Sequence, residues 1–99
     1  MSTQSATRTR ENVRIREPKK YRVIMHNDDF TTMEFVVSIL IDIFKKSPAD
    51  AEALMLQVHH NGRAAVGIYP YDIACTKVSL ALTRAKEENF PFRMTIEEE

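Results

Sequence analysis

The sequence predicts an α+β domain: a small, mainly antiparallel three-stranded sheet with three helices packed on one face. Residues 21–26 and 92–96 alternate apolar and polar side chains as half-buried strands do, and residues 63–69 form a short apolar run. Three further segments repeat apolar residues at helical spacing. The resulting order, strand, helix, helix, strand, helix, strand, is typical of helices layered on one side of a sheet.

Composition divides the chain into an extension and one core domain. The chain has 99 residues, of which 43% are hydrophobic and 28% charged, and its net charge is zero. Residues 1–18 are rich in Ser, Thr, Arg and Gln, so they lack the apolar surface that would offset their ordering entropy. We expect a disordered N-terminal extension over 1–18 and a folded core over 19–99.

The same composition limits the partners and the compartment. Arginines recur in the extension without interleaved aromatic residues, so we expect no nucleic-acid partner. Cys75 is the single cysteine, which fits a reducing compartment. No apolar run approaches about 18 residues, and the start lacks an apolar signal core. We expect a cytoplasmic protein that contacts no membrane and acts as a monomer.

The first helix is expected to follow the polar joint at residues 27–31. Thr31 suits the N-cap, with Glu34 three residues later as the partner in a capping box. Asp28 and Asp29 are more carboxylates than a turn needs, so we expect them to receive a cation from outside. Lys45-Lys46 is expected to close this helix. Its apolar stripe comprises Phe35, Val36, Ile39, Leu40, Ile43 and Phe44.

The second helix has clear start and stop signals. Ser47 fits the N-cap and Pro48 the first helical position, and Asn61-Gly62 is a left-handed stop. The strand that follows contains Gly67, which predicts a bulge or a close backbone approach. The residues predicted to share one helical face are Ala51, Leu54, Met55, Val58 and His59.

The third helix is expected to open at Pro70 and to stop at residues 89–91. Its predicted inward residues are Ile73, Ala74, Val78, Ala81, Leu82 and Ala85.

The polar residues do not assemble into an enzyme or a metal centre. A metal site would need Asp28 or Asp29 with His59 and His60, but adjacent histidines at a helix end point in different directions. Cys75 lies in mid-helix and is expected to be a packed small hydrophobe rather than a nucleophile. We therefore expect no catalysis, no metal and no cofactor.

Taken together, three motifs resemble the ClpS family. They are Asn-Asp-Asp-Phe-Thr-Thr-Met-Glu-Phe-Val at 27–36, Leu-Met-Leu-Gln-Val-His-His-Asn-Gly-Arg at 54–63 and Thr-Lys-Val at 76–78. The resemblance covers about residues 20–97, in order and nearly without gaps. It implies a small adaptor of the bacterial N-degron pathway, which hands substrate proteins to the ClpA unfoldase of the ClpAP protease.

The resemblance implies a substrate site in two parts. Asn27, Asp29 and His59 would accept hydrogen bonds from the free α-amino group of a substrate, since an ammonium offers three donors. An apolar pocket would take a first side chain of Leu, Phe, Tyr or Trp, and Met33 would act as a gate against side chains branched at Cβ. The residues that match the pocket are Asp28, Thr31, Met33, Val36, Met55, Val58 and Phe92.

Two departures from the family pattern fall at this site. Phe92 stands where the family usually has Leu, and the larger ring is expected to make the pocket shallower. Thr32 stands where Pro is common, which is expected to loosen the turn while Thr31 remains the cap.

The resemblance also implies a partner surface on the third helix. Asp72 and Lys77 match family positions that contact the N-terminal domain of ClpA, and the extension would be engaged by the unfoldase pore. One alternative remains at this point. The small α+β core also resembles the C-terminal domain of the ribosomal stalk protein, a translation-associated module that would not need the Asn-Asp-Asp and histidine set.

Overall fold

Strand β1 (Lys20–His26) lies at the centre of the fold, between two strands that both run antiparallel to it. The computed structural model describes residues 19–99, and in it the sheet has the order β2-β1-β3, with β2 at Arg63–Pro70 and β3 at Arg93–Glu98. Val23 and Met25 of β1 are fully buried on the helical side. The extension predicted for residues 1–18 lies outside the described residues.

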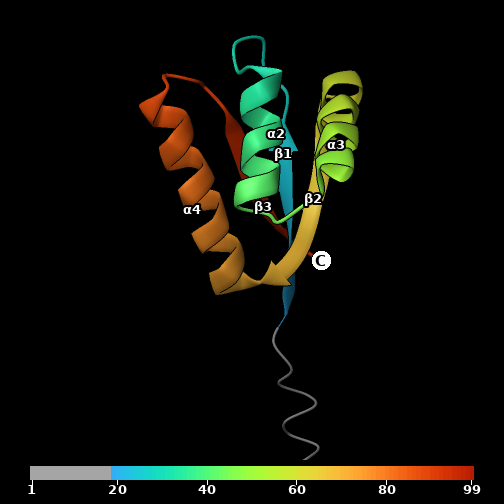
Figure 1. Ribbon diagram of the computed structural model, residues 1–99. Coiled ribbons are helices and arrows are strands. Elements are labelled where there is room, and N and C mark those ends of the chain that lie inside the picture. Colours follow the sequence, from blue (N-terminus) through green and yellow to red (C-terminus); the bar gives the residue numbers. More distant parts are fainter. Residues whose placement is uncertain (1–18) are drawn as a thin grey trace, which may run out of the picture.

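Three helices cover one face of this sheet (Figure 1). They are α2 (Met33–Asp42), α3 (Pro48–Asn61) and α4 (Tyr71–Glu87), which confirms the predicted α+β class and order of elements. The predicted apolar stripe of the first helix is buried throughout. In α4 the prediction was wrong for Ile73, whose side chain is 44% exposed, although Ala74, Val78, Ala81 and Ala85 are buried as expected. Within residues 19–99, none of the helices is both long and apolar enough to cross a membrane.

The start of α2 differs from the prediction by one residue. Thr32, not Thr31, is the N-cap: its hydroxyl oxygen accepts a hydrogen bond from the N–H of Phe35 at 3.2 Å. Thr31 is engaged elsewhere, because its hydroxyl donates to the carboxylate of Asp28 at 2.7 Å. With Thr32 as the cap, Glu34 is no longer three residues away, so the predicted capping box does not form.

The end of α2 was also predicted too late. The helix ends at Asp42, and Lys45 has a φ of 58°, which turns the chain towards α3. The cation at this helix end comes from α4 instead. The ammonium of Lys77 donates to the carbonyl oxygen of Ile43 at 2.8 Å, where a positive charge favours the helix dipole.

The structure confirms the predicted start and end of α3 and the predicted irregularity in β2. The Ser47 hydroxyl accepts from the N–H of Asp50 at 3.1 Å, and Gly62 ends the helix with a φ of 87°. In β2, Val23 pairs with Gly67 whereas Ile24 pairs with Ala65, so the strand carries one extra residue beside the glycine. The predicted bulge is therefore confirmed.

Candidate functional site

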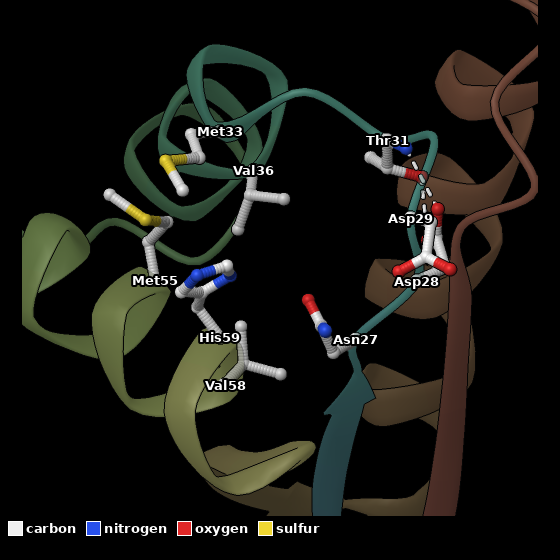
Figure 2. Close-up of a pocket in the computed structure, with 9 residues that line it drawn as sticks. All are labelled: Asn27, Asp28, Asp29, Thr31, Met33, Val36, Met55, Val58 and His59. Atoms are coloured by element: carbon white, nitrogen blue, oxygen red, sulfur yellow. Dashed lines mark hydrogen bonds between the residues drawn. The ribbon is translucent and has the colours of Figure 1, made fainter.

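A cavity of about 220 Å³ opens between the end of β1, the loop that follows it, α2 and α3 (Figure 2). Nine of the ten residues assigned to the two-part site by sequence match line it: Asn27, Asp28, Asp29, Thr31, Met33, Val36, Met55, Val58 and His59. They come from two stretches of the chain, residues 27–36 and 55–59, so the fold brings both predicted parts of the site into one space.

The loop after β1 is organised by Asp28. One carboxylate oxygen accepts hydrogen bonds from the N–H groups of Phe30 and Thr31, at 2.8 and 2.7 Å, and the other accepts from the Thr31 hydroxyl. The Asp28 carboxylate thus accepts three hydrogen bonds within its own turn. Among the described residues, none donates a hydrogen bond to the Asp29 carboxylate, which is exposed.

These hydrogen bonds also set the charge state of Asp28. Burial by itself raises the pKa of this carboxyl group, but the hydrogen bonds from Thr31 and Phe30 stabilise the carboxylate and outweigh that effect. The net result is a pKa below the usual value of 3.8. The Asp28 carboxylate is therefore ionised at neutral pH and is used within the loop, whereas the side chain of Asp29 is exposed at the cavity.

Three side chains that can accept hydrogen bonds line the cavity. Asn27 follows β1, Asp29 lies in the loop, and His59 comes from the last turn of α3. The N–H of Asn27 donates to the carbonyl oxygen of Gly62 at 2.9 Å, which ties the end of β1 to the end of α3. In Figure 2 the side chains of Asn27 and His59 extend from these two elements into the same space. An amide oxygen, a carboxylate and an imidazole nitrogen are thereby offered together.

The side chains around His59 on the helical side are apolar (Figure 2). Val36 of α2 and Met55 and Val58 of α3 are buried, with exposed fractions of 7%, 9% and 4%. Met33, at the first turn of α2, is 45% exposed and lies beside Met55 at the rim (Figure 2). The cavity therefore has an apolar interior, polar side chains in its lining and a flexible thioether at its mouth.

Phe92 is the one predicted pocket residue that does not line the cavity. Its ring is buried in the core, 5.9 Å from the ring of Phe35 and nearly perpendicular to it. The ring of Phe90 also packs against that of Phe35, with the two ring centroids 5.1 Å apart. A ring this large packs into the aromatic cluster, so its influence on the cavity passes through Phe35 and the neighbouring helix rather than through direct contact.

A second hollow, of about 380 Å³, lies between the end of α2 and the first half of α4. It brings together Asp72 and Lys77, the two residues predicted to face a partner. Ile73 and Leu80 lie on its surface with 44% and 53% of their side chains exposed, and the sequence pattern had not marked them as a surface pair. The complete lining is Asp42, Ile43, Lys45, Asp72, Ile73, Thr76, Lys77 and Leu80.

Comparison with known proteins identifies the family. A family model described as ATP-dependent Clp protease adaptor protein ClpS matches residues 16–95. The chain belongs to the ClpS family. It is thus a member of a family of Clp protease adaptors, which decides against the alternative of a translation-associated module.

Relatives named ATP-dependent Clp protease adapter protein ClpS match over most of their length. The relative from Treponema denticola is 58% identical over 82% of this chain and 80% of its own. That from Nitratidesulfovibrio vulgaris (strain Miyazaki F) is 51% identical over 85% of this chain and 84% of its own. The relative from Acetivibrio thermocellus is 46% identical over the whole of both chains.

A solved structure supports the same assignment. ClpS2 of Agrobacterium tumefaciens, bound to L-phenylalaninamide, superimposes with a TM-score of 0.81 at 38% identity. The match covers 84% of this chain and all of that chain.

The Asp28 turn leads to a prediction about acid. Because the pKa of Asp28 is lower in the folded chain than its ordinary value, its carboxylate stabilises the loop above that value. This stabilisation is lost only as the pH falls below 3.8 and through the folded-state pKa. In an NMR titration, the amide resonances of Phe30 and Thr31 should move with a midpoint below 3.8. Thr31→Val, which removes one hydrogen bond, should raise the midpoint, and an identical midpoint in both proteins would contradict this account.

Proposed function

We propose that this ClpS-family chain binds proteins through a free N-terminal α-amino group and a bulky first side chain, Leu, Phe, Tyr or Trp, and delivers them to the ClpA unfoldase of ClpAP. One observation carries the proposal: three side chains that accept hydrogen bonds and an apolar interior line the same cavity. Only the first residue of a protein combines a cationic amine with a side chain on the same carbon atom.

The chemistry of these three acceptors suits an ammonium group. Asn27, Asp29 and His59 supply one acceptor each, which matches the three N–H donors of the amine. Hydrogen bonds to charged groups are worth about 1.5–3 kcal/mol each. The exposed Asp29 carboxylate supplies the negative charge, because that of Asp28 is held by its own turn.

The apolar interior would supply most of the side-chain selectivity. Burying a Leu or Phe side chain is worth about 1.5–3 kcal/mol. Together with the amine contacts, and after the cost of association, this suggests affinities of about micromolar or tighter. The ligand of Agrobacterium tumefaciens ClpS2 has the matching chemistry, since L-phenylalaninamide carries a free amine and a phenylalanine side chain on one carbon.

A direct test compares peptides that differ only at the first residue or in N-terminal acetylation. Peptides that start with Phe should bind roughly tenfold to 150-fold more tightly than those that start with Ala, because of the buried side chain. Acetylation of the Phe peptide should weaken binding by more than about 100-fold, because the ammonium donors are lost. Equal affinity for the free and the acetylated peptide, measured by fluorescence anisotropy, would overturn the proposal.

Met33 provides a second test, because it lies at the mouth of the cavity. Its side chain would exclude first residues that carry bulk at Cβ. Met33→Ala should strengthen binding of peptides that start with Ile or Val by about tenfold or more, with little change for Phe. Leu56→Ala is a suitable control, because Leu56 is an exposed apolar residue of α3 that does not line the cavity. The gate is refuted if Ile remains excluded in the folded Met33→Ala protein.

For delivery, we propose that the hollow between α2 and α4 docks on the N-terminal domain of ClpA and that residues 1–18 are engaged by the unfoldase pore. The hollow offers what a protein interface needs, exposed apolar residues (Ile73 and Leu80) flanked by opposite charges (Asp72 and Lys77). Lys77 also holds the end of α2, so its removal would disturb the fold as well as the surface. We propose that the chain works in this way as a monomer in the cytoplasm.

Asp72 therefore gives the cleaner test of delivery. Asp72→Lys reverses a charge on the exposed surface and should slow ClpAP degradation of a Phe-initiated substrate by at least about tenfold, while peptide affinity stays unchanged. Glu87→Lys makes the same charge change at the far end of α4, also on an exposed residue, and should leave both activities unchanged. If the two variants behaved alike, the hollow would not be the docking surface.

A further inference from the structure

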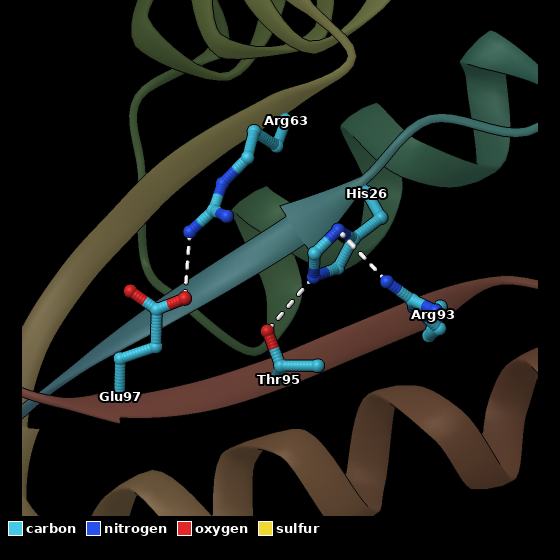
Figure 3. Close-up of polar contacts among 5 residues, drawn as sticks. All are labelled: His26, Arg63, Arg93, Thr95 and Glu97. Carbon is cyan, nitrogen blue, oxygen red and sulfur yellow. Dashed lines mark hydrogen bonds and ion pairs between the residues drawn. The ribbon is translucent and has the colours of Figure 1, made fainter.

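The sheet face opposite the helices carries a row of basic side chains. All three helices lie on the other face (Figure 1), so within residues 19–99 no helix covers this one. His26 of β1 pairs directly with Arg63 of β2 and with Arg93 of β3. Figure 3 shows these three side chains side by side across the sheet. We call Arg63, His26 and Arg93 the basic row.

Such a row is not what folding alone favours. Neighbouring strands are only about 4.8 Å apart, so a protonated His26 would put like charges directly opposite one another, which is destabilising. Arg63 is partly compensated, because its guanidinium pairs with Glu97 at 2.7 Å. For Arg93, no carboxylate lies within ion-pair distance in the described part of the chain, and its guanidinium is 3.4 Å from Nδ1 of His26. The row therefore presents uncompensated positive charge to whatever approaches this face.

The hydrogen bonds of His26 indicate which of its ring nitrogens carries the proton. A guanidinium can only donate, so Nδ1 accepts from Arg93 and the ring proton lies on Nε2. Nε2–H then donates to the Thr95 hydroxyl at 2.8 Å. Burial, followed by the charges of Arg93 and Arg63, lowers the pKa of His26, and Glu97 opposes this only weakly. The imidazole is thus neutral at pH 7 and can gain a proton when a negative group arrives.

We propose that the basic row is a docking site for an acidic segment of a partner protein, whose carboxylates pair with Arg93 and Arg63. An acidic segment is the occupant because its negative carboxylates complement the positive arginines. The composition of the neighbouring surface also suits a peptide. Ile68, paired with Arg22 on the same face, is 46% exposed and offers an apolar contact beside a charged side chain. On the same face, Glu97 follows on β3 and would repel the continuous phosphates of a nucleic acid, whereas a peptide can alternate carboxylates with apolar residues.

This site is separate from the proposed substrate cavity. The cavity is lined from the helical side, whereas the row faces away from the helices. A carboxylate bound at the row would favour the protonated imidazole of His26. The charged groups that face this ring are Arg93 and Glu97 on β3 and Arg63 on β2. Because the pKa of free His26 lies below the ordinary value of 6.5, docking should strengthen as the pH falls towards and below that value.

The test uses the full chain and an acidic peptide with both ends blocked, acetyl-Leu-Glu-Leu-Glu-Leu-Glu-amide. The acetyl group removes the amine that the proposed substrate site requires, so the two proposals stand or fall separately. Binding is measured by fluorescence anisotropy, and the imidazole resonances of His26 are titrated by NMR with and without peptide. We expect saturable binding that weakens with salt, and a higher His26 pKa in the complex.

Matched variants locate the contact. Arg93→Gln should weaken peptide binding roughly two- to fivefold, as expected for an exposed ion pair. The double variant Arg63→Gln with Arg93→Gln should weaken it further and should abolish the shift of the His26 resonances. Arg84→Gln is the control, because Arg84 pairs with Asp42 on the helical side, and it should bind like the unmodified chain.

Four outcomes would overturn the proposal. They are no detectable binding of the acidic peptide, equal binding of the corresponding lysine peptide, equal loss in Arg84→Gln and Arg93→Gln, or tighter binding of single-stranded oligothymidylate than of the peptide. Thermal melts by circular dichroism establish that each variant is folded before its affinity is compared. Arg93→Lys, which keeps the charge, should retain most of the binding if Arg93→Gln acts through electrostatics.

Discussion

The hydrogen bond from the N–H of Asn27 to the carbonyl oxygen of Gly62 is the constraint on which the site depends. It joins the end of the central strand to the end of α3, and so sets the distance between Asn27 and His59 across the cavity. Gly62 can make this junction because its φ of 87° lets the chain leave α3 and enter β2 at once. The pairing of β2 with β1 then holds the junction in place along the whole strand.

The adjacent carboxylates of Asp28 and Asp29, in the loop after β1, have different roles. Asp28 takes three hydrogen bonds from its own turn and makes the loop rigid, while Asp29 keeps an exposed carboxylate at the cavity. This division is a form of preorganisation, since the loop need not be ordered when a ligand arrives. It also explains why the cap of α2 moves to Thr32, because the hydroxyl of Thr31 is already donated to Asp28.

The three-element helical layer and the bare sheet face give the molecule two unlike sides. On the helical side, apolar side chains meet in the cavity and in the hollow by α4, both flanked by charges. On the other side, the strands expose mostly polar side chains, and cross-strand pairing gathers Arg63, His26 and Arg93. A central strand can thus contribute to surfaces on both faces, because successive side chains point in opposite directions.

The sequence by itself determined the elements and most of the site. Alternation and helical spacing located all six elements, the Ser47 cap and the Gly62 stop were read from local chemistry, and motif similarity assigned nine residues that do line one cavity. Tertiary structure alone decided that Thr31 bonds Asp28, that Lys77 reaches the end of α2, that Phe92 packs against Phe35 and that Ile73 is exposed. The difference has one physical origin. Caps and periodicity depend on backbone conformation within a few residues, whereas competition for a hydroxyl, a carbonyl or a place in the core depends on groups that only the folded chain brings together.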